Sequence, residues 1–237
     1  MGVDAIIWDY DGTLVDSARK NMAVTVEVLR HFDQEIELHL PDALKSYEDY
    51  SLANHTYKNW RDLYKNSFNI REEDLDEAGK LWTPEQCKNK IIPDFFSGME
   101  DLLHKMKPIK MGICSQNSSK NIEDTLRYYG VEDCFEMLIG VDEVSGKEQK
   151  PHPAGFIKCL QGLRVPTGEA NVIYIGDHSE DVVFGKNAQE QFREDGLRVI
   201  CIAVDFLQQE HLGVWKVEPD YRAKSVGELH TILFSLI

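Results

Sequence analysis

The sequence has few positive charges for its length. Its 237 residues include 26 Lys and Arg against 41 Asp and Glu, which gives a formal net charge of -15 at pH 7. Surfaces that bind nucleic acid or an anionic membrane need clustered lysine and arginine, so we expect neither partner. A negative chain that acts on an anion must neutralise that anion locally. Any such site should therefore contain a divalent cation or a cluster of positive groups.

Long hydrophobic runs are also missing. The first apolar stretch, residues 5–8, is too short for a signal peptide and stops at an acid. No stretch approaches the roughly 20 apolar residues of a membrane-spanning helix. The opening MGVDAI lacks the Ser or Thr of a myristoylation signal. We therefore expect a soluble, cytoplasmic protein that is not bound to a membrane.

Cysteine is scarce and shows no pairing pattern. No CxxC pair and no histidine spacing typical of zinc occurs around the five cysteines, Cys87, Cys114, Cys134, Cys159 and Cys201. This favours reduced thiols that pack as small hydrophobes over disulfides, metal ligands or redox centres. Hydrophobic residues make up 42% of the chain, which allows a substantial core. The oligomeric state is not fixed by these features, and we expect a monomer or a small homo-oligomer.

Short apolar runs alternate with helical patterns along most of the chain. Five runs that stop at polar residues predict strands at residues 5–8, 111–114, 137–139, 172–175 and 199–204. Apolar residues at spacings of three and four predict helices at residues 99–106, 120–129, 154–163, 181–192 and 225–236. Strands and helices in alternation give right-handed crossovers. The predicted fold is therefore α/β, with a doubly wound, Rossmann-like parallel sheet.

The segment 16–93 breaks this alternation. It has no convincing strand, and its periodicity predicts helices at residues 21–32, 52–68 and 72–82. Aromatic residues at helical spacing are expected to form its core, namely Tyr47, Tyr50, Tyr57, Trp60 and Tyr64. We therefore predict two domains, an α/β core of residues 1–15 and 94–237 and an inserted α-helical cap of residues 16–93. The cap should lie over the carboxyl edge of the sheet.

Two acids follow the first predicted strand at once. Asp9 and Asp11 lead into Gly12 and Thr13. Ligands of open parallel sheets bind outside the carboxyl ends of the strands, which is where Asp9 should lie. Gly12 permits the sharp turn that aims the second acid at the same point. One carboxylate could attack and the other could move protons, whereas a metal-binding pair or a turn-forming pair is the alternative.

Further polar groups lie at or near the ends of later strands. Ser115 ends one apolar run, Lys150 lies in KEQKPHP, and GDHSED at residues 176–181 ends another run. With DYDGTLVDS at residues 9–17, these four motifs resemble, in order and spacing, the haloacid dehalogenase-like hydrolase superfamily. The helical insert lies where that family has its small α-helical cap. Connecting segments such as KPHP are similar to its phosphoglycolate phosphatase-like branch.

The resemblance implies a role for each matched residue. Asp9 would be the nucleophile that forms an aspartyl-phosphate, and Asp11 would protonate the leaving oxygen and later activate water. Thr13 is expected to orient or hydrogen-bond this acid pair. The implied catalytic residues are Asp9, Asp11, Thr13, Ser115 and Lys150, the phosphate-binding residues are Ser115, Gln116, Asn117 and Lys150, and the metal ligands are Asp9, Asp11, Asp177 and Asp181. The implied cofactor is Mg²⁺, which suits oxygen ligands and would compensate the converging carboxylates.

An acid at position 11 separates chemistries within the family. Members that cleave carbon–halogen or phosphonate bonds lack one there, so Asp11 favours a phosphatase that hydrolyses a small phosphorylated metabolite. A sugar phosphomutase on the same scaffold is the nearest alternative. A phospho-accepting signalling domain and a non-catalytic protein are alternatives from other classes. The large insert and the second acid count against the signalling domain, and the complete set of site residues counts against loss of catalysis.

Several residues keep a second interpretation. Lys150 could be a solvated loop lysine, Asp177 could cap the following helix, and Asp181 could interact with the dipole of that helix. His178 is interpreted as a partly exposed loop side chain and His152 as structural. Basic residues of the insert could meet the substrate, but each singly is better explained as part of a solvated helical face; these are Lys20, Lys45, His55, Lys58 and Arg61.

Overall fold

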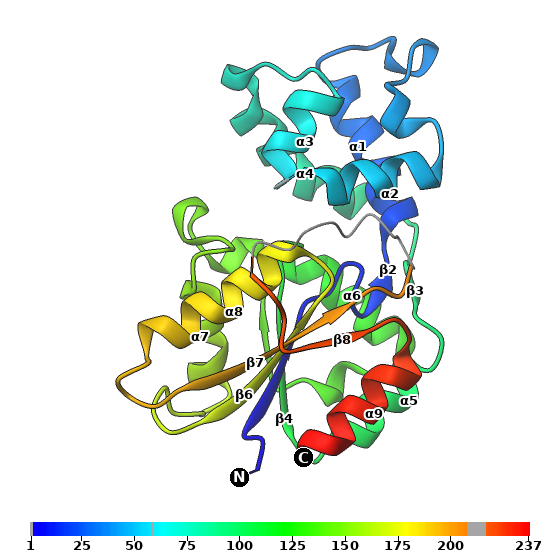
Figure 1. Ribbon diagram of the computed structural model, residues 1–237. Coiled ribbons are helices and arrows are strands. Elements are labelled where there is room, and N and C mark those ends of the chain that lie inside the picture. Colours follow the sequence, from blue (N-terminus) through cyan, green and yellow to red (C-terminus); the bar gives the residue numbers. More distant parts are fainter. Residues whose placement is uncertain (1, 58, 208–216) are drawn as a thin grey trace. The chain divides into compact units, whose positions relative to one another are not determined.

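The computed structural model describes residues 2–57, 59–207 and 217–237, and the chain forms two compact units (Figure 1). One unit comprises Met1–Asp16 and Asp94–Ile237, and the other comprises Ser17–Pro93. The sequence placed Asp16 in the helical insert, whereas it lies on strand β2 (Val15–Asp16) of the first unit. No helix among the described residues is long and apolar enough to cross a membrane.

The first unit is built on a parallel sheet. Within the described residues it has six strands in the order β5-β4-β1-β6-β7-β8, and every neighbouring pair is parallel. The strands are β1 (Ala5–Trp8), β4 (Lys110–Cys114), β5 (Met137–Ile139), β6 (Asn171–Gly176), β7 (Arg198–Val204) and β8 (Tyr221–Ala223). The predicted fold class is thereby confirmed. The prediction of five core strands was wrong, because β8 is short and two of its three residues are exposed, so it lacks an apolar run.

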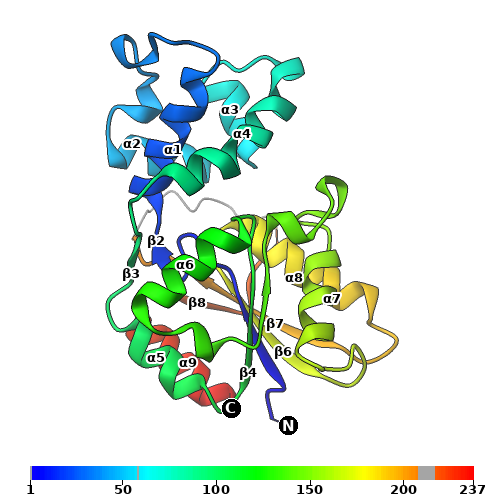
Figure 2. The same ribbon diagram turned by 180° about the vertical axis from the view of Figure 1, so that it is seen from behind.

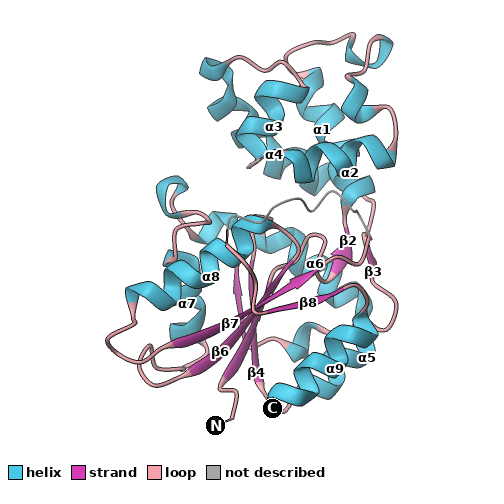
Figure 3. Ribbon diagram, in the orientation of Figure 1, coloured by secondary structure: helices cyan, strands magenta, loops and turns pink. Residues whose placement is uncertain are grey.

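Helices cover both faces of this sheet (Figures 2 and 3). They are α5 (Met99–Met106), α6 (Ser119–Tyr129), α7 (Ala154–Gly162), α8 (Ser179–Gln191) and α9 (Val226–Leu236). Successive strand residues point to opposite faces. In β1, Ile6 and Trp8 accordingly pack with α5, α6 and α9, whereas Ala5 and Ile7 pack with α7 and α8. Both faces are buried, which explains why the strands are continuous apolar runs.

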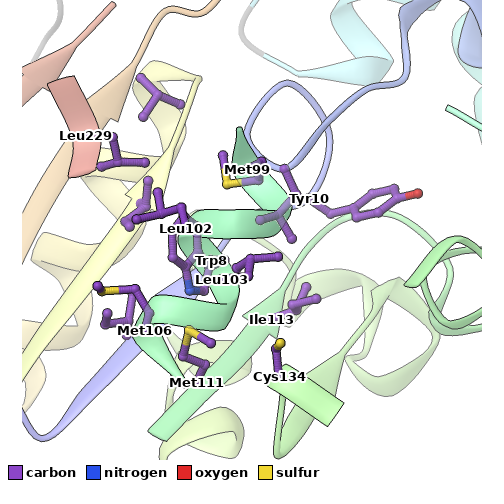
Figure 4. Packing of buried hydrophobic residues seen from close by; sticks show 14 of the residues in the cluster. Trp8, Tyr10, Met99, Leu102, Leu103, Met106, Met111, Ile113, Cys134 and Leu229 are labelled. Carbon is purple, nitrogen blue, oxygen red and sulfur yellow. The ribbon is translucent and has the colours of Figure 1, made fainter. Parts of the chain in front are cut away.

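The residues on either side of Asp9 are anchored in the core. The Trp8 and Tyr10 side chains are fully buried with Met99, Leu103 and other apolar residues of one cluster (Figure 4). Burying an aromatic or large aliphatic side chain contributes roughly 1.5–3 kcal/mol. Tyr10 Oη also donates a hydrogen bond to Thr125 Oγ1 over 2.8 Å. The loop that carries Asp9 is therefore fixed from both sides by packing.

The second unit is helical, with its own core. Its helices are α1 (Ala18–Arg30), α2 (Tyr47–Thr56), α3 (Trp60–Ser67) and α4 (Leu75–Lys88). The single helix predicted at residues 52–68 was wrong: α2 ends at Thr56, and Asn59 begins α3 by accepting a hydrogen bond from Asp62 N. An N-cap side chain of this kind favours a new helix start. Among the predicted core aromatics, Tyr50, Tyr57, Trp60 and Tyr64 pack in the cluster, while Tyr47 lies outside it.

Short irregular elements complete the chain. Strands β2 and β3 (Asp94–Phe95) pair antiparallel at the two points where the helical segment leaves and rejoins the first unit. These strands are two residues long, so no periodicity could indicate them. Single turns of 3₁₀-helix occur at Ile36–Leu38, Asp42–Leu44, Glu72–Asp74, Glu132–Cys134, Val141–Glu143 and Gly146–Glu148. All five cysteines are free thiols, and four of them are buried.

Candidate active site

The candidate site lies where the order of strands reverses. Strand β1 is followed along the sheet by β4 and β5 on one side, and β6 is followed by β7 and β8 on the other. Such a reversal opens a crevice at the carboxyl ends of the two central strands. Asp9 directly follows β1, and Asp177 directly follows β6. The topology therefore brings two acids that are distant in sequence to one point.

The loop after β1 is held in a tight turn. Asp9 N donates to Ile175 O at 2.8 Å, and Leu14 N donates to Tyr10 O at 2.9 Å. Gly12 has a φ of 70°, in the left-handed region where a side chain is strained. A Cβ atom at Gly12 would also overlap the Asp177 carboxylate. Glycine is therefore required both for the turn and for the close approach of the second acid.

Lys150 reaches this acid cluster from the loop between β5 and α7. Its Nζ donates to Asp9 Oδ1 at 2.5 Å and to Asp181 Oδ1 at 2.8 Å. It also lies 5.3 Å from the ring centroids of both Tyr174 and Phe184. Only 7% of the Lys150 side chain is exposed, so the interpretation as a solvated loop lysine was wrong.

The charged groups of this cluster shift one another's pKa values. Burial would lower the pKa of Lys150, but the Asp181 and Asp9 carboxylates raise it above its usual value, so the ammonium form is retained. Burial likewise would raise the pKa of Asp181, but the charge and hydrogen bond of Lys150 outweigh that effect and lower it. Burial raises the pKa of Asp9 well above its usual value, and Lys150 only partly opposes the rise. One ammonium ion thus balances one of two buried carboxylates.

The remaining negative charge is suited to a metal ion. Carboxylate oxygens of Asp9, Asp177 and Asp181 lie within 4.8 Å of one another. An all-oxygen set that carries more negative than positive charge fits a hard divalent cation such as Mg²⁺. Asp181 is held in place by three hydrogen bonds, which it accepts from Lys150 Nζ, from Tyr174 Oη at 3.0 Å and from His178 N at 3.0 Å.

The segment after β4 contributes three polar side chains, which face different partners. Ser115 is buried beside the site, and its Oγ accepts a hydrogen bond from Asn117 N at 3.2 Å. Gln116 Nε2 donates to the backbone oxygen of Lys150 at 3.2 Å. Asn117 Nδ2 donates to Asp11 Oδ2 at 2.8 Å. Gln116 therefore contacts the lysine loop and Asn117 contacts the second acid, although both were predicted to bind phosphate.

Two expectations about side-chain contacts are not met. Thr13 Oγ1 is buried and has no hydrogen-bond partner among the described residues, so the hydrogen bond predicted from Thr13 to the acid pair is not formed. The N-cap of α8 is His178 and not Asp177, because His178 Nδ1 accepts from Glu180 N at 3.2 Å. Asp181 completes this capping box, which gives it a structural contact besides the one to Lys150. His152 has the structural contact that was expected, because its Nδ1 accepts a hydrogen bond from Ala154 N, the first residue of α7, at 3.2 Å.

The basic residues of the helical unit mostly have partners within that unit. Lys45 contacts Asp42, His55 contacts Ser51 O, and Arg61 contacts both Asp76 and the Trp60 ring. Lys20 is buried, so the expected solvated position was wrong for this residue. Lys58 lies outside the described residues.

Tyr174 is a site residue that the sequence did not indicate. Its hydroxyl donates to Asp181 Oδ1, and its ring lies against Lys150. The residue lies inside the apolar run VIYI of β6, where a tyrosine is most simply read as core. Only its position two residues before Gly176, on the face of β6 that packs against α8, could have pointed to the site.

A switch point with two neighbouring acids, a buried ammonium and oxygen donors suited to a metal is the arrangement expected of the class of enzymes that bind and transfer a phosphoryl group. The chain belongs to the haloacid dehalogenase-like hydrolase family, whose profile matches residues 6–193. The family predicted from the sequence motifs is therefore confirmed. The predicted class of enzyme, a hydrolase of this family, is confirmed as well.

Relatives extend over nearly the whole chain. Pyrophosphatase PpaX from Listeria monocytogenes is 24% identical over an alignment of 237 positions, and the alignment covers 98% of this chain and 96% of the relative. Pyrophosphatase PpaX from Bacillus cereus is 20% identical over 234 residues, which cover 98% and 97%. A mutant of CbbY from Rhodobacter sphaeroides, solved in complex with xylulose-(1,5)bisphosphate, is 19% identical with a TM-score of 0.66, and the match covers 96% of each chain. At this identity the solved structure supports the fold alone.

Proposed function

We propose that this protein is a Mg²⁺-dependent phosphatase that hydrolyses a small phosphorylated metabolite through an aspartyl-phosphate. The observation that carries the proposal is the position of Asp9. Its carboxylate lies at the switch point of the sheet, in contact with the Lys150 ammonium and within 4.8 Å of carboxylate oxygens of Asp177 and Asp181. A phosphoryl group bound there would meet a nucleophile, a fixed positive charge and metal ligands at once.

The two acids have separate tasks in this mechanism. An oxygen of Asp9 attacks phosphorus, the bond from phosphorus to the leaving oxygen breaks, and Asp11 donates a proton to that oxygen. Asp11 then removes a proton from the water that attacks the aspartyl-phosphate. The phosphorus–oxygen bond to Asp9 breaks, and inorganic phosphate leaves. Both carboxylates return to their starting protonation states.

The other residues hold charge and geometry. Ser115 and Lys150 bind the phosphoryl oxygens, and Lys150 neutralises the charge that moves during transfer. Asp9, Asp177 and the backbone oxygen of Asp11 would hold Mg²⁺, which would supply further positive charge to the phosphoryl oxygens and favour the ionised form of Asp9. Asp181, which already accepts three hydrogen bonds, supports the metal site mainly by holding Lys150 in place.

The first test is hydrolysis of p-nitrophenyl phosphate by the purified protein. We expect Mg²⁺-dependent release of nitrophenol together with inorganic phosphate, and loss of activity to background in excess chelator. Mg²⁺ should also raise the midpoint temperature of unfolding, because it binds the folded carboxylate cluster and not the unfolded chain. Activity that is unchanged in chelator would contradict the proposed metal dependence. Absence of any released phosphate would contradict the phosphatase itself.

The second test concerns the proton donor. We expect Asp11→Asn to lower kcat on phenyl phosphate by about 10²- to 10⁴-fold, the usual contribution of general acid catalysis. On p-nitrophenyl phosphate the loss should be smaller, because an activated leaving group needs less protonation. Steady-state kinetics on both substrates measure the difference. Equal losses on both would argue against proton donation by Asp11.

Substrate choice is assigned to the helical unit, which we propose to act as a cap. A panel of phosphorylated metabolites that includes sugar phosphates and inorganic pyrophosphate, the compound in the name of the PpaX relatives, would identify the preferred substrate. The same panel separates hydrolysis from phosphomutase chemistry, because only hydrolysis releases phosphate stoichiometrically. We also propose a cytoplasmic location. For the oligomeric state we propose a monomer or a small homo-oligomer, and size-exclusion chromatography would test this.

A further inference from the structure

The side chain of Asn117 is fixed by three hydrogen bonds in the interior of the first unit. Its Oδ1 accepts from Ser118 N at 2.8 Å and from Asn121 Nδ2 at 3.1 Å, and its Nδ2 donates to Asp11 Oδ2 at 2.8 Å. Only 3% of the residue is exposed. A backbone N–H can only donate, so the atom that faces Ser118 N must be the amide oxygen. The N–H group of Asn117 therefore necessarily faces Asp11.

Residues of helix α6 extend this hydrogen-bond network beyond Asn117. Asn121 N donates to Ser118 Oγ at 3.3 Å, and Asn121 O accepts from Thr125 Oγ1 at 3.1 Å. Thr125 Oγ1 in turn accepts a hydrogen bond from the hydroxyl of Tyr10, the residue next to Asp11. One continuous chain of buried hydrogen bonds thus holds both Tyr10 and Asp11 of the loop after β1. A buried polar network in which the members satisfy one another is rigid.

We propose that Asn117 is a positioning residue for the general acid Asp11 and does not bind the phosphoryl group. This inference rests on the phosphatase proposed above. The carbonyl oxygen of a carboxylic acid accepts a hydrogen bond better than its hydroxyl oxygen does, so the Asn117 N–H at Asp11 Oδ2 favours the acid form with its proton on Asp11 Oδ1. The hydrogen bond thereby selects the oxygen that transfers the proton and fixes the plane of the carboxyl group. General acid catalysis depends on this geometry, because the donor must lie within hydrogen-bond reach of the leaving oxygen.

The variant Asn117→Asp tests the proposal most directly. It keeps the shape of the side chain and an oxygen for Ser118 N and Asn121, but it replaces the N–H group that faces Asp11 by a second oxygen. We expect kcat on phenyl phosphate to fall about 10-fold or more, with a clearly smaller loss on p-nitrophenyl phosphate. Asn117→Ala should show the same dependence on the leaving group. A residue that merely stabilises the fold would lower both activities by the same factor.

A double-mutant cycle identifies the residue through which Asn117 acts. If it acts through Asp11, then Asn117→Asp should not change the leaving-group dependence further in an Asp11→Asn background. The matched control is Asn171→Ala, at the opposite end of β6, where the side chain donates one hydrogen bond among the described residues, to Gly2 O at 3.4 Å. This control should keep the wild-type ratio of the two activities. Thermal unfolding of each variant verifies that it is folded.

The outcomes separate this inference from the function on which it rests. Wild-type protein without phosphatase activity would overturn both. An active wild type with Asn117 variants that lose equally on both substrates, or that lose mainly through a raised KM, would overturn only the positioning role. The latter result would return Asn117 to the phosphate-binding role predicted from the sequence.

Discussion

Asp9→Asn is expected to abolish turnover, with a loss in kcat of about 10⁴- to 10⁶-fold, the range typical when a nucleophile is removed. The amide oxygen of asparagine is too poor a nucleophile to attack phosphorus, although the side chain has nearly the same volume. Its Oδ1 can still accept the hydrogen bond from Lys150 Nζ that Asp9 accepts in the native protein. The loss should therefore arise from chemistry and not from a changed fold. Phosphate release from p-nitrophenyl phosphate measures it.

Stability provides the control for this variant. Burial raises the pKa of Asp9, so the ionised carboxylate is an unfavourable group in the metal-free fold. A neutral amide removes that cost, and the free energy of unfolding should not fall in metal-free buffer. Acid quench during turnover gives a second readout, because wild-type protein should trap phosphate in an acid-stable, base-labile bond and Asp9→Asn should not. Normal turnover by a pure, folded Asp9→Asn sample would refute the nucleophile assignment.

Lys150→Met should give the second large effect, on stability as well as on activity. Lys150 is the cation that contacts both buried acids, Asp9 and Asp181. Removing one partner of a buried ion pair leaves uncompensated charge and commonly costs about 3–5 kcal/mol. Methionine keeps most of the apolar stem, so the loss isolates the charge. Denaturant unfolding at neutral pH, without metal, measures it, and turnover should fall by about 10²-fold or more.

The stability of Lys150→Met should also depend on pH with a defined sign. Without the ammonium ion, the pKa values of Asp9 and Asp181 in the folded chain lie above those in the unfolded chain. The folded state then binds more protons at these two groups, so their contribution to stability is most favourable below the unfolded pKa of about 4 and is lost as pH rises above it. The exposed Lys158→Met, on α7, is the matched control and should show neither effect. Similar pH profiles for the two variants would show that Lys150 does not compensate buried charge.

Sequence patterns predicted the fold well wherever both faces of a strand are buried. The five apolar runs all form strands of one parallel sheet, because such runs are stable only between two layers of helices. Strand β8 was missed since only Ala223 among its three residues is buried. The boundary between α2 and α3 was missed for a related reason. Its signal is the single cap Asn59 within a continuous helical periodicity.

The sequence indicated which polar residues follow the strand ends, but it did not indicate Tyr174 or the contacts that these residues make. Asp9, Asp11, Ser115 and Asp177 follow strand ends, so the topology of a parallel sheet gathers them whatever the details of packing. The hydrogen-bond partners of Gln116, Asn117 and Asp181 could not be predicted from the topology of the sheet. Each is selected by side-chain packing across the sheet edge, where several donors compete for the same few oxygens.

The sequence by itself determined the family of this protein, because the residue types that follow the strand ends and their order along the chain carry the resemblance that the family match confirmed. Only the tertiary structure decided how those groups share their charges. Lys150 lies 141 residues from Asp9 and donates to it, and Asn117 lies 106 residues from Asp11 and orients it. Such contacts depend on distances of a few ångströms between separate strands and loops. No local pattern encodes these distances, because they are set by the packing of the whole core.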